Sequence, residues 1–265
     1  MKTSIQFHSK DNKELSGILH EPDIVETQAY ALFAHCFTCT KDINAAVNIA
    51  KVLADQGIAT LRFDFAGLGA SDGDFADTNF TTNIEDLISA AAFLADNFNA
   101  PQILIGHSLG GTAALAASQH IPSIKAVATI GSPASADHVL HVLEDHLDAL
   151  KQDGEAVVPL AGRSHTFRQG FIDDVTAHLA DYSKLGKALM VMHAPFDTVV
   201  SIDEATKIFS QAKHPKNFVS LDKADHLLSR KQDASYVGEV LASWARHYIS
   251  FEASQSGENT EKAII

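Results

Sequence analysis

Short apolar runs alternate along the chain with longer segments in which apolar residues recur at helical spacing. An apolar run of about four to eight residues is typical of a buried strand, whereas recurrence every three to four residues predicts an amphipathic helix. The pattern predicts strands at residues 4–8, 15–20, 30–34, 59–63, 102–105, 126–130, 188–194 and 217–221. It predicts helices at residues 44–56, 83–98, 108–120, 203–212 and 234–249.

The order of these elements predicts an α/β fold. Strands that are apolar throughout and alternate with helices form a mostly parallel sheet with helices on both faces. The first two strands instead alternate apolar and polar residues around Asp11-Asn12-Lys13, which indicates a hairpin at the sheet edge.

The alternation breaks between residues 133 and 184, which are more polar than the rest of the chain. Two amphipathic helical stretches, at 137–151 and 170–182, lie there on either side of Val157-Val158-Pro159-Leu160. We interpret this segment as a cap that folds over the site. The predicted organisation is therefore a core at 1–132 and 185–250, a helical cap insertion at 133–184 and a polar, disordered tail at 251–265.

The transition from the strand at 102–105 to the following helix carries the strongest chemical signal. There the chain reads Gly106-His107-Ser108-Leu109-Gly110. In this nucleophile-elbow pattern a serine on a sharp turn projects its hydroxyl above the sheet, and the glycines leave room for the turn. A Gly/Ser loop can match by chance, but the strand before and the helix after favour Ser108 as a nucleophile.

A serine nucleophile needs a base, and the base needs an acid that orients it. In one known chain order the acid and then the histidine follow the serine. Asp197 comes just after the strand at 188–194, and His226 lies on the loop after the strand at 217–221. Active residues of open α/β sheets lie at these carboxyl ends, so we predict Asp197 as the acid and His226 as the base.

Four residues are alternatives to this pair. His193 lies within an apolar strand, which favours an interior role, and His214 precedes a proline in a predicted surface turn. Asp222 and Asp225 are closer to His226 in sequence. Adjacency in sequence is not the required geometry, so we interpret these two aspartates as residues that tie the loop together.

An oxyanion hole needs two N–H donors directed at one point. Leu109, the residue after the nucleophile, supplies the first. The second is expected from the loop His35-Cys36-Phe37-Thr38 after an early strand, with the Phe37 N–H as our prediction and the Cys36 N–H as the alternative.

Composition narrows the class of protein. The 265-residue chain has a formal net charge of −13, which argues against nucleic acid or an anionic membrane as a partner. It contains no apolar stretch that could span a bilayer and no secretory signal pattern at its start. We expect a cytoplasmic protein, while the oligomeric state is not readable from the sequence.

The two cysteines, Cys36 and Cys39, have a spacing that also occurs in redox and metal sites. A zinc site would need further ligands, so we interpret the pair as buried structural thiols. We predict no metal and no cofactor.

Three other groups of residues are weaker signals. We interpret the histidines of the first cap helix as a solvated face and the Gly67-x-Gly69 loop as a site of tight packing. Arg163, His165 and Arg168 could bind an anion or lie on the surface.

Several of these motifs resemble a known family. His35-Cys36-Phe37-Thr38 is similar to the H-G-F-T oxyanion loop of cinnamoyl/feruloyl-type esterases in the α/β-hydrolase superfamily, with a cysteine in place of glycine. The loop at 62–73 resembles the D-x-x-G-x-G-x-S-x-G loop of the same group. Over about residues 30–249 the chain also resembles the hydrolase half of proteins that fuse an α/β-hydrolase to an OsmC-like peroxide-reducing domain. The resemblance covers only the hydrolase half, so a peroxidase role is not carried over.

The sequence therefore predicts a serine esterase of the α/β-hydrolase fold that acts on small, short-acyl esters through an acyl-enzyme. A feruloyl/cinnamoyl esterase is one alternative, and an acyltransferase or cofactor-free perhydrolase using the same triad is another. A non-catalytic accessory protein on the same fold is the third.

Overall fold

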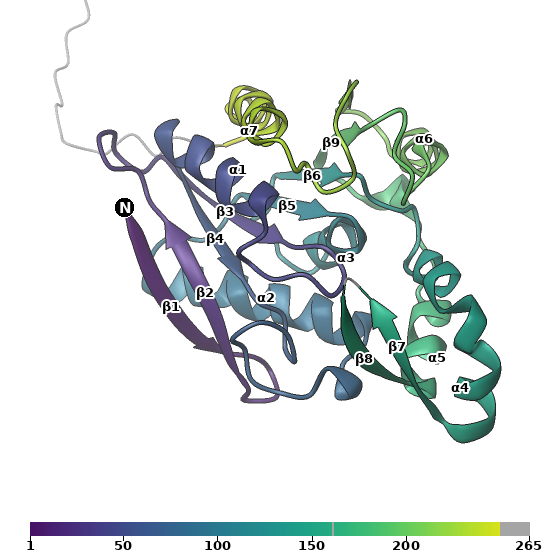
Figure 1. Ribbon diagram of the computed structural model, residues 1–265. Coiled ribbons are helices and arrows are strands. Elements are labelled where there is room, and N and C mark those ends of the chain that lie inside the picture. The colour runs from purple at the N-terminus through teal and green to yellow at the C-terminus, as the bar shows by residue number, and fades with distance from the viewer. Residues whose placement is uncertain (161, 250–265) are drawn as a thin grey trace, which may run out of the picture.

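A computed structural model describes residues 1–160 and 162–249, and Figure 1 shows its arrangement. The tail predicted at 251–265 lies outside the described residues. The elements form three layers, in which one large sheet separates two groups of helices.

The described strands form an eight-stranded central sheet in the order β1-β2-β4-β3-β5-β6-β9-β10. Pairing is antiparallel between β1 and β2 and between β2 and β4, and it is parallel between all other neighbours. The predicted mostly parallel sheet with an edge hairpin is thus confirmed. The strands are β1 Lys2–His8, β2 Glu14–His20, β3 Ala29–Ala34, β4 Ile58–Phe63, β5 Ile103–His107, β6 Ala126–Ile130, β9 Ala188–His193 and β10 Lys216–Ser220.

Helices cover both faces of the sheet (Figure 1). On one face α1 (Asn44–Asp55) packs against α7 (Lys231–Ala245) through a core that includes Ile49 and Leu241. The other face carries α2 Phe80–Asn97, α3 Leu109–Ser118 and α6 Ile202–Gln211. Within the described part, no helix combines the length and apolarity that a bilayer crossing requires.

The start of α2 differs from the sequence prediction by one turn. The helix begins at Phe80 rather than at residue 83 because Asn79 and Thr82 form a reciprocal capping box. The Asn79 side chain accepts the Thr82 N–H at 2.9 Å, and the Thr82 hydroxyl accepts the Asn79 N–H at 2.9 Å. This pair of polar residues satisfies two backbone donors that a helix start leaves free.

The segment between β6 and β9 contains a β-hairpin that the sequence pattern missed. Strands β7 and β8 pair in a two-stranded antiparallel sheet of their own. Each strand buries part of one face, with Val158 and Phe167 in the core. The segment predicted as a helical cap therefore contains helices and, between them, a β-hairpin. Its elements are a 3-10 helix Ala136–His146, α4 Leu147–Asp153, β7 Glu155–Leu160, β8 Arg163–Arg168, α5 Gln169–Ala177 and a 3-10 turn Tyr182–Lys184.

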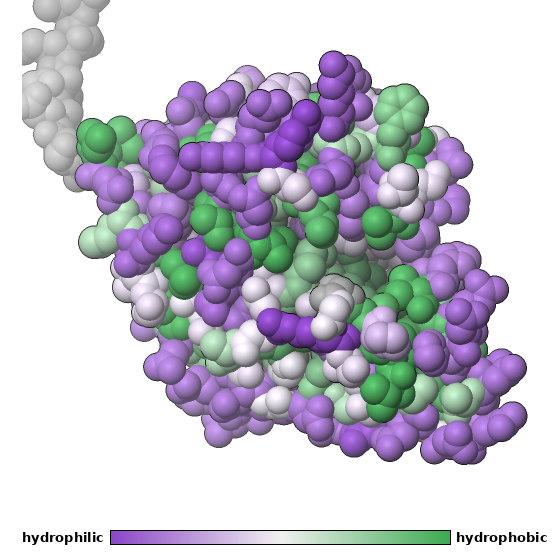
Figure 2. All heavy atoms as spheres, in the orientation of Figure 1, coloured by the Kyte–Doolittle hydropathy of each residue, from purple (hydrophilic) through white to green (hydrophobic). Residues whose placement is uncertain are grey.

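Polar and aromatic contacts dock this segment onto the core. Asp174 on α5 accepts hydrogen bonds from the Thr81 N–H at 2.9 Å and the Thr81 hydroxyl at 2.6 Å. Arg168 forms an ion pair with Asp77. Figure 2 shows apolar side chains gathered around a recess between this segment and the rest of the molecule.

Candidate active site

Ser108 occupies a strained position between β5 and α3. Its φ of +54° and ψ of −130° lie outside the regions that non-glycine residues normally adopt. The turn is possible only because its neighbours lack side chains: a Cβ on Gly106 would lie 2.3 Å from the Gly110 oxygen, and one on Gly110 would lie 2.2 Å from the His35 oxygen. Such a strained strand-to-helix turn is the conformation of a nucleophile elbow.

Asp197 and His226 are hydrogen-bonded to each other. The His226 Nδ1 lies 2.7 Å from Asp197 Oδ2, and the two side chains are 9% and 1% exposed. The other carboxylate oxygen accepts the N–H groups of Val199 at 2.8 Å and Val200 at 3.0 Å. Burial alone would raise the pKa of Asp197, but the hydrogen bonds from His226 and the Val200 N–H outweigh it and lower the pKa. The carboxylate is therefore ionised at neutral pH and fixes the ring with its Nδ1–H toward Asp197.

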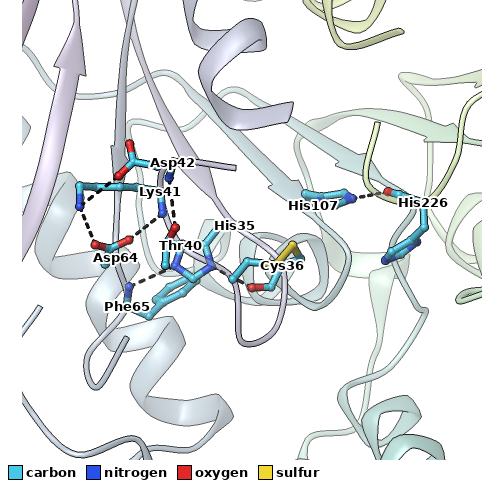
Figure 3. The surroundings of a disulfide bond; sticks show 10 residues. His35, Cys36, Thr40, Lys41, Asp42, Asp64, Phe65, His107 and His226 are labelled. Atoms are coloured by element: carbon cyan, nitrogen blue, oxygen red, sulfur yellow. Dashed lines mark hydrogen bonds and ion pairs between the residues drawn. A yellow bond between two sulfur atoms is a disulfide. The ribbon is translucent and has the colours of Figure 1, made fainter. Parts of the chain in front are cut away.

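His107 connects the elbow to the histidine loop, a role that the sequence did not indicate. Its Nε2 donates to the His226 carbonyl at 2.7 Å, and the two rings are 5.2 Å apart between centroids (Figure 3). Burial, and then the neighbouring His226, lower the pKa of His107 to about 4. A neutral ring next to Ser108 thus holds the loop that carries His226. No hydrogen bond joins the Ser108 hydroxyl to His226 among the described residues, and such bonds are often loose without substrate.

Phe37 and Leu109, the predicted oxyanion donors, line one pocket. Its volume is about 20 Å³, close to the space that one water molecule needs. Phe171 of α5 closes it from the cap side, and the Phe37 ring stacks on that residue at a centroid distance of 5.7 Å. The two residues predicted to supply the donors therefore line the same pocket, beside the first turn of α3.

Comparison with known proteins agrees with the fold. The chain is 44% identical to the esterase domain of a Rhodothermus marinus protein, covering 94% of this chain and 100% of that one with a TM-score of 0.78. A family model described as serine aminopeptidase, S33 (Hydrolase_4), matches residues 27–151. The chain belongs to the α/β-hydrolase superfamily.

One further relative and one further solved structure are similar to this chain. The mouse mitochondrial palmitoyl-protein thioesterase ABHD10 is 29% identical over 198 residues, which are 71% of this chain but only 65% of that protein, just under two thirds of its length. The Est1E protein of Butyrivibrio proteoclasticus, solved with ferulic acid, is 19% identical over 92% of this chain and 99% of its own, with a TM-score of 0.76. The second likeness shows the fold alone.

A buried ion pair that the sequence did not indicate holds the loop predicted to form the oxyanion hole. Asp64 accepts the Lys41 N–H at 2.6 Å and the Lys41 ammonium at 2.6 Å, and it is fully buried (Figure 3). It also accepts the Ala70 N–H at 2.9 Å. Gly69 has a φ of +57°, and a Cβ there would lie 2.1 Å from Asp64 Oδ2. The glycine-rich loop therefore wraps a carboxylate, which explains the residue pattern better than close packing alone.

The two cysteines are not free thiols. Cys36 and Cys39 form a disulfide, which corrects the prediction of buried structural thiols. The Cys39 N–H donates to the Cys36 carbonyl at 3.1 Å, and this turn brings the two Cα atoms to 5.3 Å. That separation lies within the range that a disulfide bridges. The sequence showed the spacing but not the turn that closes it.

Two of the four alternatives to the Asp197–His226 pair hydrogen-bond to the backbone, and the other two are exposed. The His193 ring donates through Nε2 to the Val200 carbonyl at 2.9 Å, and His214 is exposed. Asp225 accepts the Ser229 N–H at 2.7 Å, whereas Asp222 is exposed. The three basic residues of β8 form no common site, because His165 is buried while Arg168 pairs with Asp77 and Glu155. A search of the described residues finds no group of His, Cys, Asp or Glu that could hold a metal ion.

Proposed function

We propose that the protein is a serine hydrolase that cleaves carboxylic esters through an acyl-enzyme. The observation that carries the proposal is the 2.7 Å hydrogen bond between Asp197 and His226, at the same sheet edge as the strained Ser108 elbow. The coarser assignment, a hydrolase of the esterase or thioesterase kind, is supported by the relatives described above.

In the proposed mechanism Ser108 attacks the ester carbonyl while the His226 Nε2 takes its proton. Asp197 stabilises the imidazolium that forms, because its carboxylate accepts the Nδ1–H. The Phe37 and Leu109 N–H groups hold the oxyanion of the tetrahedral intermediate. His226 then gives the proton to the leaving alcohol, and water releases the acyl group by the same steps in reverse.

A short acyl group is proposed because the cap segment is small. The pocket beside Phe37 and Leu109 is lined by neither Ser108 nor His226, so its volume of about 20 Å³ does not measure the space for the acyl chain. The mouse relative is named for a palmitoyl substrate. A thioesterase is nevertheless the second candidate function, since the same triad cleaves oxygen esters and thioesters.

The test is a series of p-nitrophenyl esters from acetate to palmitate, with methyl ferulate and a palmitoyl thioester beside them. Wild type should hydrolyse acetate and butyrate best, and Ser108→Ala should abolish the activity. Ser229→Ala, an exposed serine next to the histidine loop, is the matched control and should behave as wild type.

Other outcomes would redirect the proposal. A preference for methyl ferulate would indicate a feruloyl esterase, and a preference for the thioester would indicate a thioesterase. Products formed with added alcohol or peroxide in place of water would indicate acyl transfer or perhydrolysis. Activity that persists in Ser108→Ala would exclude Ser108 as the nucleophile, and a folded wild type that cleaves none of these substrates would favour an accessory role.

A further inference from the structure

The Cys36–Cys39 disulfide encloses the residue that we propose as an oxyanion donor. Phe37 and Thr38 are the two residues between the cysteines, and Thr38 has a φ of +58°. Cys36 is 4% exposed, whereas Cys39 is half-buried. The covalent link therefore closes a tight turn whose first peptide bond carries the Phe37 N–H.

The direction of that N–H is set by the carbonyl on the same peptide. In a trans peptide the C=O of Cys36 and the N–H of Phe37 point in opposite directions within one plane. The Cys36 carbonyl accepts the His35 Nδ1–H at 2.8 Å and the Cys39 N–H at 3.1 Å. The His35 Nε2 accepts the Phe65 N–H at 3.3 Å, which leaves the proton on Nδ1 (Figure 3). Two donors thus hold the peptide plane, and one of them belongs to Cys39.

The loop around this peptide is held on both sides by buried groups. The Lys41–Asp64 ion pair fixes the chain after the turn, and the buried His35 ring fixes the chain before it. The Phe37 ring packs on Phe167 and Phe171 of the cap, which restrains the side chain rather than the backbone. The disulfide adds a covalent restraint to the turn in which the Cys39 N–H meets the Cys36 carbonyl.

We propose that the Cys36–Cys39 disulfide is a positioning element of the oxyanion hole, so that the oxidised protein is the more active hydrolase and its reduction lowers kcat. This inference rests on the proposed function. Reduction by a dithiol proceeds by attack of its thiolate on the Cys39 sulfur, which breaks the protein S–S bond and releases the Cys36 thiolate to take up a proton. The second thiol of the reductant then displaces Cys39, leaving two protein thiols and one oxidised, cyclic dithiol.

The sequence contains only these two cysteines, so a reductant acts on no other disulfide within the chain. Steady-state kcat and KM for p-nitrophenyl acetate are measured on oxidised protein, on protein reduced with dithiothreitol under argon, and on reoxidised protein, with the redox state checked by thiol titration. Loss of one oxyanion donor costs about 10²–10³ in kcat. A misaligned donor is expected to lower kcat by about tenfold or more, with KM little changed and full recovery on reoxidation. Equal kcat in the oxidised and reduced forms would overturn the proposal.

The double variant Cys36→Ser/Cys39→Ser is the matched control. It should have the kcat of the reduced wild type and no response to reductant, with a thermal unfolding midpoint measured to show that it is folded. If it does not fold, Cys39→Ser alone replaces it, since this variant keeps the buried Cys36. A variant with the kcat of the oxidised wild type would overturn the proposal.

Hydrogen exchange of the Phe37 amide separates this inference from the proposed function. Reduction should change its chemical shift and speed its exchange, whether or not any ester is hydrolysed. That change in a protein without hydrolase activity would support the positioning role and contradict the proposed function. An unchanged Phe37 amide in an active enzyme would overturn the positioning role and leave the proposed function standing.

Discussion

The two sides of the candidate site are held in different ways. On the acid–histidine side, one 2.7 Å hydrogen bond joins Asp197 to His226, and two backbone N–H groups hold the carboxylate. On the oxyanion side, a buried ion pair between Lys41 and Asp64 and a disulfide hold the backbone. The difference follows from what each side supplies: a side-chain pair needs one aligned contact, whereas a backbone donor needs the whole peptide plane to be fixed.

The largest effect is expected from a substitution that disrupts the Asp197–His226 pair. Asp197→Asn should lower kcat by about 10⁴-fold with little change in KM, because an amide no longer fixes the ring tautomer or stabilises the imidazolium. Steady-state kinetics with p-nitrophenyl acetate measure kcat and KM of the variant. Asp222→Asn, an exposed aspartate on the histidine loop, is the control and should match wild type. Similar losses in both variants would argue against Asp197 as the orienting acid.

The second prediction concerns the buried Lys41–Asp64 ion pair on the oxyanion side. Asp64→Asn removes the buried carboxylate from the Lys41 ammonium and leaves it only the more distant, exposed Asp42 at 3.7 Å, so it should lower the free energy of unfolding by about 3 kcal/mol. Urea unfolding of the variant and of wild type measures this difference in the free energy of unfolding. Asp55→Asn removes an exposed pair with Lys51 and should leave stability unchanged. A stable Asp64→Asn would show that the ion pair does not hold the loop.

The third prediction concerns a carboxyl group that ties α2 to the same loop. Burial raises the pKa of Asp86 to about 7, and the side chain accepts the Ala66 N–H at 2.9 Å. Since the folded-state pKa is the higher one, the group stabilises the fold at low pH, and this contribution is lost as the pH rises toward 7 and above. Relative to Asp86→Asn, wild type should lose about 2.5 kcal/mol of unfolding free energy between pH 5 and pH 8.

Urea unfolding of both proteins at the two pH values measures this difference. Two parallel pH profiles would mean that Asp86 titrates near its ordinary value in the folded protein.

The smallest expected effect concerns the cap, which contacts the oxyanion side. Arg168→Ala removes a partly exposed pair with Asp77 and should cost less than about 1 kcal/mol. Thermal unfolding and ester KM values should both remain close to those of wild type. A large rise in KM would show that this ion pair sets the position of the cap over the pocket.

The sequence predicts the acid–histidine side better than the oxyanion side. Ser108 sits in a motif whose glycines are required sterically. Asp197 follows β9, a fully buried apolar strand, whereas His226 follows β10, a short strand with only two apolar residues. Parallel strands bring their carboxyl ends together, so position along the chain already implies proximity.

The remaining features depend on contacts between segments that no local pattern records. Lys41 and Asp64 are charged residues that pair in the interior, 23 positions apart. The hairpin of β7 and β8 is half-exposed, so its apolar signal is weak. The disulfide depends on the turn at Thr38, which has a positive φ. A threonine in the sequence does not predict such a turn.

The most direct test of the central claim is to trap the acyl-enzyme. Protein mixed rapidly with p-nitrophenyl acetate is quenched in acid, and its mass and peptides are measured. The account predicts a mass increase of one acetyl group on the peptide that contains Ser108, absent in Ser108→Ala and accumulating in Asp197→Asn only at a much slower rate. Rapid ester hydrolysis with the acetyl group on another residue, or with equal turnover in Ser108→Ala, would contradict it.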